Sequence, residues 1–293
     1  MPGFMIKKPA DEPGKSWPAI VIGLFVAFGG VLYGYDTGTI SGILAMPYWL
    51  QQFSTEANGE ITPAQDSLIV SILSAGTFFG ALFAAPTADF LGRRIGLMAS
   101  AGLVFNLGVI LQTASTDQPM FIAGRFFAGL GVGLISAMIP MYQSETAPKW
   151  IRGVIVGSYQ LAITIGLFLA AIVNNSTKDR NDSGSYRIPI AVQFAWSSIL
   201  VIGLFILPET PRYLIKMDRY EKAAKALSRL RQLPVEDPAI AEELGEVQAN
   251  HQYELSLGKG SYIDCFKGTV GKRLLTGCGL QALQQLTGVN FIF

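Results

Sequence analysis

The sequence predicts an all-α polytopic membrane protein, and two observations favour this fold class. Of the 293 residues, 50% are hydrophobic and only 15% are charged, with a mean hydropathy of +0.39. Soluble domains carry about 25% charged residues. The apolar residues also gather into runs of about 20, the length that an α-helix needs to cross about 30 Å of hydrocarbon. This composition excludes a disordered chain, and the two cysteines exclude a disulfide scaffold.

Six apolar runs are predicted to be membrane-spanning helices, at residues 18–45, 67–86, 95–115, 120–142, 154–173 and 189–207. We interpret residues 18–207 as one six-helix transmembrane bundle. A seventh apolar run begins near residue 272 and is still apolar at the last residue, Phe293. Residues 272–293 are therefore predicted to be the truncated start of a seventh transmembrane helix. We expect the chain to be a fragment whose C-terminal half is missing.

The positions of lysine and arginine predict the orientation, because cytoplasmic loops are enriched in both. Basic residues lie in residues 1–17, in the loops after the second and fourth spans, and along residues 208–271, whereas the alternate loops hold few. Residues 1–17 and 208–271 are therefore predicted to be cytoplasmic. Charged sequence with helical apolar spacing predicts short helices within residues 208–271. The opposite loop contains N-x-Ser/Thr sequons at Asn174, Asn175 and Asn181, which mark either glycosylation or a chance pattern.

Two ionisable residues of opposite charge lie within predicted spans. Asp36 falls in the first span and Arg125 in the fourth, at similar depth in the outer half of the bilayer. A charge in hydrocarbon is costly and indicates a functional site, so each residue is the expected partner of the other. A carboxylate that feels both burial and a nearby arginine can take up a proton when its surroundings change. The alternative is a purely structural ion pair.

A ladder of glycines also marks the first span, because Gly30, Gly34, Gly38 and Gly42 recur every four residues. Small residues at this spacing allow close helix–helix contact in membranes. Asp36 falls roughly opposite the centre of the ladder. One face of this helix is therefore predicted to pack and the other to present a carboxylate to the interior.

Six motifs occur in an order that points to one family. They are GYDTGTISG at 34–42, ADFLGRR at 88–94, GRFFAGLGVG at 124–133, PMYQSETAPKWIRG at 140–153, PETPRYL at 208–214 and QQLTGVN at 284–290. Together they resemble the sugar porter family of the major facilitator superfamily, and within it the fungal hexose and glucose transporters. The resemblance covers residues 17–293. It implies a fold of about twelve helices in two six-helix halves, with substrate bound near the midplane between halves that rock about it.

The resemblance assigns sugar binding to Gln160 in the fifth span and to Gln284, Gln285 and Asn290 in the seventh. The chemistry agrees, because amides both donate and accept hydrogen bonds, as sugar hydroxyls do. The alternative is that these amides bond to neighbouring helices. Tyr33, about one turn before Asp36, is a further candidate to line the cavity.

The resemblance also implies ion pairs that lock the cytoplasmic ends of the helices in the outward-facing state. The candidate residues follow the second, fourth and sixth spans: Asp89, Arg93, Arg94, Glu145, Arg152, Glu209 and Arg212. Orientation alone explains the arginines but not the three acids. The family motif usually begins with glycine and has a basic residue after the aspartate, whereas this chain has Ala85 and Phe90 there.

The leading hypothesis is transport of a hexose, most simply glucose, across the plasma membrane by alternating access, coupled to protons through Asp36 and Arg125. The alternatives are facilitated diffusion without protons and a glucose sensor of the same fold that does not transport. The expected partners are the hexose, the proton, the lipid bilayer and the missing C-terminal half, and no nucleic acid. With a single histidine and no nucleophile motif, the sequence predicts no enzyme, no metal site and no cofactor.

Overall fold

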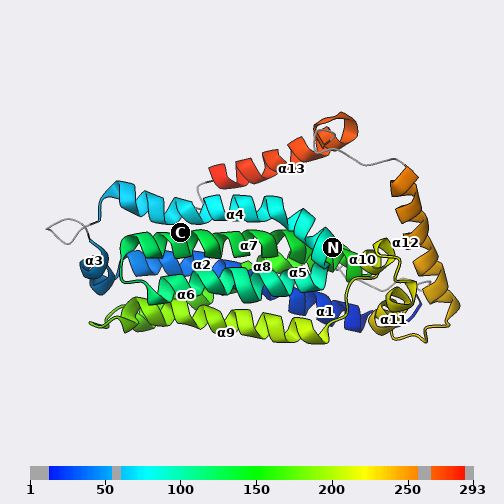
Figure 1. The fold of residues 1–293 in the computed structure, drawn as a ribbon, viewed down its shortest axis with the longest axis horizontal. Coiled ribbons are helices and arrows are strands. Elements are labelled where there is room, and N and C mark those ends of the chain that lie inside the picture. Colours follow the sequence, from blue (N-terminus) through cyan, green and yellow to red (C-terminus); the bar gives the residue numbers. More distant parts are fainter. Residues whose placement is uncertain (1–12, 55–60, 257–264, 288–293) are drawn as a thin grey trace, which may run out of the picture. The chain divides into compact units, whose positions relative to one another are not determined.

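The computed structural model describes residues 13–54, 61–256 and 265–287, and the regular secondary structure of these residues is helical (Figure 1). The described residues up to Leu244 form one compact unit, and those from Gly245 form a second. The two units are described separately below.

Six helical segments among the described residues are long and apolar enough to cross a membrane. They are Trp17–Leu44, Pro63–Leu91, Arg93–Ala114, Gln118–Thr146, Arg152–Thr177 and Gly184–Ile206. They coincide with the six predicted spans, so the predicted bundle is confirmed. Most of the helices are longer than the predictions, because the predictions followed the apolar residues whereas a helix can continue past them into polar sequence.

Two of the spans are not continuous α-helices. The first consists of α1 (Trp17–Ala27) and α2 (Gly29–Leu44), which are interrupted at Phe28. The third consists of α5 (Arg93–Ala99), the π-helical turn η1 (Ser100–Phe105) and α6 (Asn106–Ala114). The other spans are α4 (Pro63–Leu91), α7 (Gln118–Thr146), α8 (Arg152–Thr177) and α9 (Gly184–Ile206), and a short helix α3 (Pro47–Phe53) follows the first span.

Local sequence explains where α4 begins and ends. Thr62 and Gln65 form a capping box, in which the Gln65 N–H donates to Thr62 Oγ1 and the Thr62 N–H donates to Gln65 Oε1. The helix ends at Gly92, whose φ of +93° is a conformation that L side chains rarely adopt. This single glycine turns the chain directly from the second span into the third.

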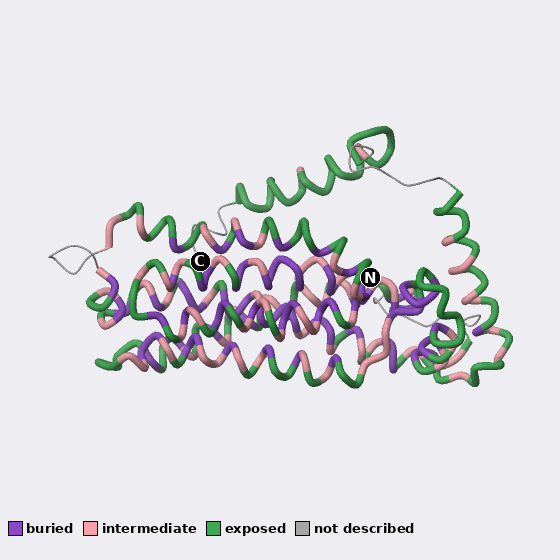
Figure 2. The backbone as a smooth tube through the Cα atoms, viewed as in Figure 1, coloured by how far each residue is buried: buried purple, intermediate pink, exposed green. Residues whose placement is uncertain are grey.

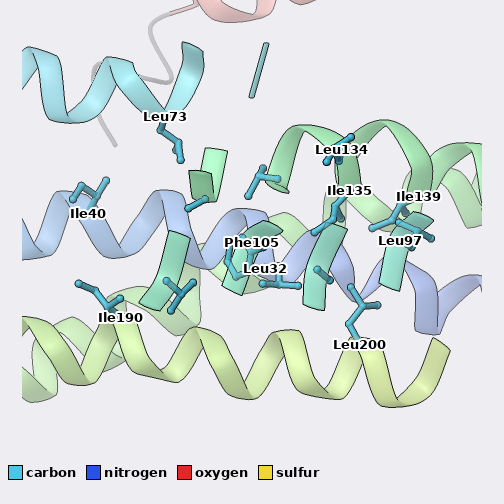
Figure 3. Packing of buried hydrophobic residues seen from close by; sticks show 14 of the residues in the cluster. Leu32, Ile40, Leu73, Leu97, Phe105, Leu134, Ile135, Ile139, Ile190 and Leu200 are labelled. Atoms are coloured by element: carbon cyan, nitrogen blue, oxygen red, sulfur yellow. The ribbon is translucent and has the colours of Figure 1, made fainter. Parts of the chain in front are cut away.

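Buried side chains from all the spans except α8 meet in one apolar core, and the partly buried Tyr159 of α8 packs against it. Figure 3 shows Leu32 and Ile40 of α2, Leu73 of α4, Leu97 of α5, Phe105 of η1, Leu134, Ile135 and Ile139 of α7, and Ile190 and Leu200 of α9. Helix α7 packs along α4 and α6, whereas α2 packs along α8 and α9. Helix α7 is therefore the most enclosed of the spans, which suits the position of Arg125 within it.

The outer surface of the bundle is apolar. Large exposed side chains include Phe78 and Phe83 of α4, Phe168 of α8 and Phe205 of α9. Figure 2 shows exposed segments along the outer helices and buried segments toward the interior. An apolar surface of this kind is suited to contact with lipid. The helices can lie in lipid because their backbone N–H and C=O groups are hydrogen-bonded within each helix.

The predicted glycine ladder forms the contact between α2 and α8. A Cβ atom at Gly34 would collide with the backbone of Ile163, and one at Gly42 would collide with the side chain of Asn174. Gly30 similarly lies against Tyr159 of α8. The small residues therefore bring the two backbones together, as the spacing predicted.

The contact between α2 and α8 also involves the asparagine of one of the three sequons. Asn174 is buried, and its Nδ2 donates to the carbonyl oxygens of Gly38 and Thr39, each at 3.2 Å. Its side-chain amide is therefore engaged in helix packing. Asn175 and Asn181 are exposed.

Three short helices follow the sixth span: α10 (Pro211–Lys216), α11 (Tyr220–Arg231) and α12 (Pro238–Ser256). Leu227 and Leu230 bury the apolar face of α11. Arg231, at the end of α11, forms an ion pair with Glu243 of α12 at 2.6 Å, and its carbonyl accepts from the N–H of Lys15 at 2.8 Å. These helices bear out the secondary structure predicted within residues 208–271.

The second unit contains α13 (Gly268–Leu286), which begins slightly before the predicted seventh span. Every residue of this helix is at least partly exposed. It is not among the six helices found long and apolar enough to span a membrane. Residues 288–293, with Asn290, lie outside the described residues, so the seventh span stays a prediction.

Candidate functional site

A buried ion pair lies between α2 and α7. Asp36 of α2 is 0% exposed and Arg125 of α7 is 1% exposed. Arg125 Nη1 lies 3.2 Å from both Oδ1 and Oδ2 of Asp36. The structure thus brings together the two charged residues that the sequence placed within spans. Each ion compensates for the burial of the other, because an unpaired charge at this depth would be strongly disfavoured.

A third side chain completes this group, and the sequence analysis did not single it out. Gln193 of α9 is 1% exposed and donates from Nε2 to Asp36 Oδ1 at 3.2 Å. The sequence offers one signal for Gln193, an amide side chain within a predicted span. The missing information was the packing of α9 against α2. We call Asp36, Arg125 and Gln193 the Asp36 cluster.

The neighbours of Asp36 fix α2 against α9. The Tyr35 hydroxyl donates to the Pro189 carbonyl at 3.0 Å. The indole of Trp196 lies edge-on to the rings of Phe28 and Tyr35, with centroid distances of 6.0 Å in each case. Because the glycine face of α2 is turned to α8, its acidic face is left to meet α7 and α9.

Two of the predicted sugar-binding residues lie at one level of the first unit. Gly30 of α2 faces Tyr159 of α8, and Gly34 faces Ile163, so Tyr33 and Gln160 are at a similar height. Tyr33 is half-buried, and Gln160 is exposed. The side-chain amide of Gln160 is therefore not enclosed within the bundle.

The other predicted sugar-binding residues belong to the second unit. Gln284 and Gln285 are exposed residues of α13, and Asn290 lies outside the described residues. The position of α13 relative to the bundle is not defined, so the convergence of these amides with Gln160 stays a prediction.

Charged residues gather at the end of the bundle where α4, α7 and α9 end, which we call the basic end. Arg93 contacts two acids: its Nη2 lies 3.1 Å from Glu145 Oε1, and its Nη1 lies 3.4 Å from Asp89 Oδ1. The side chain of Glu145 is only 6% exposed, whereas that of Asp89 is 50% exposed. The guanidinium of Arg93 also lies over the ring of Tyr213, 5.3 Å from its centroid.

Arg94 and Glu209 connect the start of the third span to the segment after the sixth through the backbone of Arg94. The backbone N–H of Arg94 donates to Glu209 Oε1 and Oε2 at 3.1 and 3.2 Å. The guanidinium of Arg94 instead donates to the carbonyls of Leu204 and Phe205, both at 2.8 Å. These are the terminal carbonyls of α9, which lack partners within the helix. Burial raises the pKa of Glu209, although hydrogen bonds from Thr210 and Arg94 oppose this.

The remaining basic-end residues are less closely involved. Arg152 donates to the Ala147 carbonyl at 3.5 Å, and Arg212 is exposed. Two contacts were not predicted: Lys216 Nζ lies 2.9 Å from Asp89 Oδ2, and the Tyr142 hydroxyl donates to the Pro208 carbonyl at 2.7 Å. Both depend on how the chain after α9 folds back, which spacing does not reveal.

The Asp36 cluster holds a buried carboxylate between a guanidinium and an amide, and Gln160 is an exposed amide, which can both donate and accept hydrogen bonds. Among the described residues, no group of three or more His, Cys, Asp or Glu side chains is placed to hold a metal.

The bundle has the fold of solved sugar transporters of the major facilitator superfamily. The chain belongs to the family "Sugar (and other) transporter", which it matches over residues 22–293.

Curated relatives agree with this family. The chain is 66% identical over 295 residues to the major facilitator-type transporter ecdD of Aspergillus rugulosus, which covers 99% of this chain and 54% of that protein. It is 53% identical over 293 residues to the probable glucose transporter rco-3 of Neurospora crassa, covering 98% and 49%. It is 46% identical over 280 residues to the high glucose sensor RGT2 of Saccharomyces cerevisiae, covering 94% and 37%. The chain spans about half the length of the first two relatives, and less of the sensor.

Solved structures show the same fold. The proton:xylose symporter XylE bound to 6-bromo-6-deoxy-D-glucose matches with a TM-score of 0.70 and 25% identity, over 89% of this chain and 62% of that one. The partially occluded inward open form of XylE from E. coli also matches with a TM-score of 0.70, at 23% identity, over 81% and 58%.

Proposed function

We propose that the protein containing this chain carries a hexose, in particular glucose, across the plasma membrane by alternating access, coupled to protons. The observation that carries the proposal is the Asp36 cluster, buried in a bundle of the sugar transporter family at α2, the helix that also carries Tyr33. The glucose transporter among the relatives supports the substrate, and the proton:xylose symporter supports the coupling.

In this proposal, neutral amides bind the sugar. Gln160, Gln284, Gln285 and Asn290 bind its hydroxyl groups, and Tyr33 lines the cavity. Amides donate and accept at once, which matches the hydroxyls of a hexose. Because they carry no charge, the sugar can leave without separating a buried ion pair.

Asp36 and Arg125 are the proton-coupling pair. Proton uptake neutralises the carboxylate and weakens its attraction to the guanidinium, so the two helices that hold them can separate. Such a step biases the equilibrium between two conformations. Facilitated diffusion is the alternative, in which the same pair serves only to hold α2 against α7.

The basic end is the inner gate. Residues 1–17 and 208–271 are assigned to the cytoplasm by their basic content. Arg93, Glu145 and Asp89 then hold the cytoplasmic ends of α4 and α7 together while the protein faces outward, and Arg94, Arg152, Glu209 and Arg212 add to this gate.

A second candidate function is a non-transporting glucose sensor, because the high glucose sensor RGT2 is 46% identical over 280 residues. The test is expression of the complete protein in a yeast strain that lacks its own hexose transporters, with glucose uptake and external pH measured together. Uptake with alkalinisation is the expected result. Uptake without alkalinisation would favour facilitated diffusion, and a glucose response without uptake would favour the sensor.

The residue assignments are tested in the same strain. Gln160→Ala is expected to raise the glucose concentration needed for half-maximal uptake. Asp36→Asn is expected to abolish alkalinisation and concentrative uptake. Concentrative uptake that survives Asp36→Asn would contradict proton coupling through this residue.

A further inference from the structure

The amide of Gln193 satisfies only half of its hydrogen-bonding capacity. Its Nε2 donates to Asp36 Oδ1, whereas its Oε1 is buried and has no hydrogen-bond partner among the described residues. A buried polar atom without a partner costs free energy. Gln143 Oε1 is also buried without a partner in the described residues, but it has no carboxylate bonded to its amide. Arg125 shows the same pattern, because its Nε is also buried without a partner in the described part of the chain. Asp36 therefore accepts hydrogen bonds from both neighbours, and Gln193 Oε1 next to it is an acceptor that is not used.

That spare acceptor is what a protonated Asp36 would need. An ionised carboxylate only accepts hydrogen bonds, whereas a protonated carboxyl carries one O–H that must donate. Arginine cannot accept this hydrogen bond, because a guanidinium has donors only. A glutamine amide can serve both states, since rotation about its last side-chain bond exchanges Nε2 for Oε1.

We propose that Gln193 is a positioning residue for Asp36, whose amide donates to the carboxylate and, after rotating, accepts from the protonated acid. This inference rests on the protonation of Asp36 that the proposed function invokes, and it adds a residue that hydrogen-bonds to Asp36 in both protonation states. The proton comes from water and binds one carboxylate oxygen, and no covalent bond between the residues forms or breaks.

The other polar side chains around Asp36 are less suited than Gln193 to accept a hydrogen bond from the protonated acid. Among titratable or charged groups, Arg125 of α7 contacts Asp36, Tyr33 and Tyr35 lie within one turn of it on α2, and Tyr159 of α8 lies against Gly30 of α2. The Tyr35 hydroxyl is already committed to Pro189. On α9, Gln193 is the side chain seen in contact with Asp36, and it is neutral at every pH.

The test uses infrared difference spectra of the complete, reconstituted protein, recorded between acidic and neutral pH. Asp36→Asn identifies the carboxyl C=O band of Asp36 by its loss. Gln193→Leu, which keeps the side-chain volume but removes both hydrogen-bonding functions, is expected to shift that band to higher wavenumber. The matched control is Gln143→Leu, because Gln143 is also fully buried and donates to the Gly23 carbonyl at 2.8 Å. Gln143 lies about 18 residues, or about 27 Å, from Arg125 along α7, so its substitution does not touch the Asp36 cluster.

A second arm asks whether a substitute that can both donate and accept restores function. Gln193→Glu, protonated at acidic pH, is expected to keep sugar uptake there close to wild type, whereas Gln193→Leu is expected to lose about tenfold. At neutral pH the introduced carboxyl ionises and repels Asp36, so uptake by Gln193→Glu is expected to fall.

The possible results separate this inference from the proposed function. An Asp36 band that is absent, or that is the same in wild type and Gln193→Leu, would overturn the inference, as would equal effects of Gln193→Leu and Gln143→Leu. A band that shifts in Gln193→Leu alone supports it. If the band shifts but the wild type moves no protons with sugar, the inference stands and the proposed coupling fails.

Discussion

Asp36 and Arg125 depend on each other because neither has access to water. Removing one partner leaves the other buried and uncompensated, whereas removing both leaves no buried charge, only the neutral amide of Gln193. The two residues also differ in how they can respond. An aspartate can lose its charge by binding a proton, but an arginine stays charged in proteins.

These properties predict an order of stabilities. Asp36→Leu is expected to lower the free energy of unfolding most, by about 3–5 kcal/mol, and Arg125→Leu less, because Asp36 can take up a proton. The double variant is expected to be more stable than Asp36→Leu alone. Thermal unfolding of the purified variants in detergent measures this order. Additive losses in the double variant would show that the two residues act independently.

Glu209 gives a pH-dependent prediction at the basic end. Burial raises its pKa in the folded protein, so the folded state holds the proton more tightly than the unfolded chain does. Its contribution to stability is therefore present at low pH and is lost as the pH rises from the ordinary glutamate pKa through the raised value. Glu209→Gln is expected to gain stability relative to wild type over that rise.

Unfolding temperatures recorded from acidic to neutral pH measure this effect. Glu242→Gln is the matched control, because Glu242 is an exposed glutamate of α12. A Glu209→Gln curve that runs parallel to the wild-type curve would contradict the assignment.

At the scale of the element, α2 has two faces with different requirements. Its glycines approach the backbone of α8, and its acidic face meets α7 and α9. Gly34→Leu is expected to force α2 and α8 apart and to cost about 1–3 kcal/mol or more of stability. Gly157→Leu is the control, since an added Cβ there meets nothing within 4 Å. Equal unfolding temperatures for the two variants would contradict the close contact.

The sequence predicts elements better than the contacts between them. Apolar runs placed all six spans, because hydrocarbon thickness imposes their length. The ladder and the Asp36–Arg125 contact also followed from spacing and depth. The break at Phe28, the π-helical turn η1 and the contact of Gln193 with Asp36 did not, because each depends on packing between helices that are distant in sequence. Arg94 was expected to pair with an acid, yet its guanidinium binds the carbonyls that end α9.

At the scale of the whole molecule, the basic end connects α4, α5 and α7 through the contacts of Arg93. Arg93→Gln is expected to weaken this end, because Glu145 loses its cation while it remains almost fully buried. Hydrogen exchange in peptides from the α4–α5 junction and the end of α7 is expected to become faster. Arg219→Gln, at an exposed arginine that precedes α11, is the control. Unchanged exchange in Arg93→Gln would show that the contacts do not hold this end together.

Transport needs walls on both sides of the sugar. Because the chain spans about half the length of its first two relatives and leaves Gln160 exposed, residues 1–293 alone are expected to give no saturable glucose flux in liposomes. Liposomes with the complete protein provide the comparison. Saturable flux from residues 1–293 alone would contradict a cavity shared between two halves.

The burial of α2 among neighbouring helices also limits which substitutions its sequence can tolerate. Within Gly29–Leu44, only Thr37 and Ser41 are exposed, while the neighbouring backbone and the buried charge constrain the other positions. A saturation library across this helix should therefore keep little diversity outside those two positions. The sequence of this helix is therefore expected to serve as a search pattern for other chains that carry the same buried acid.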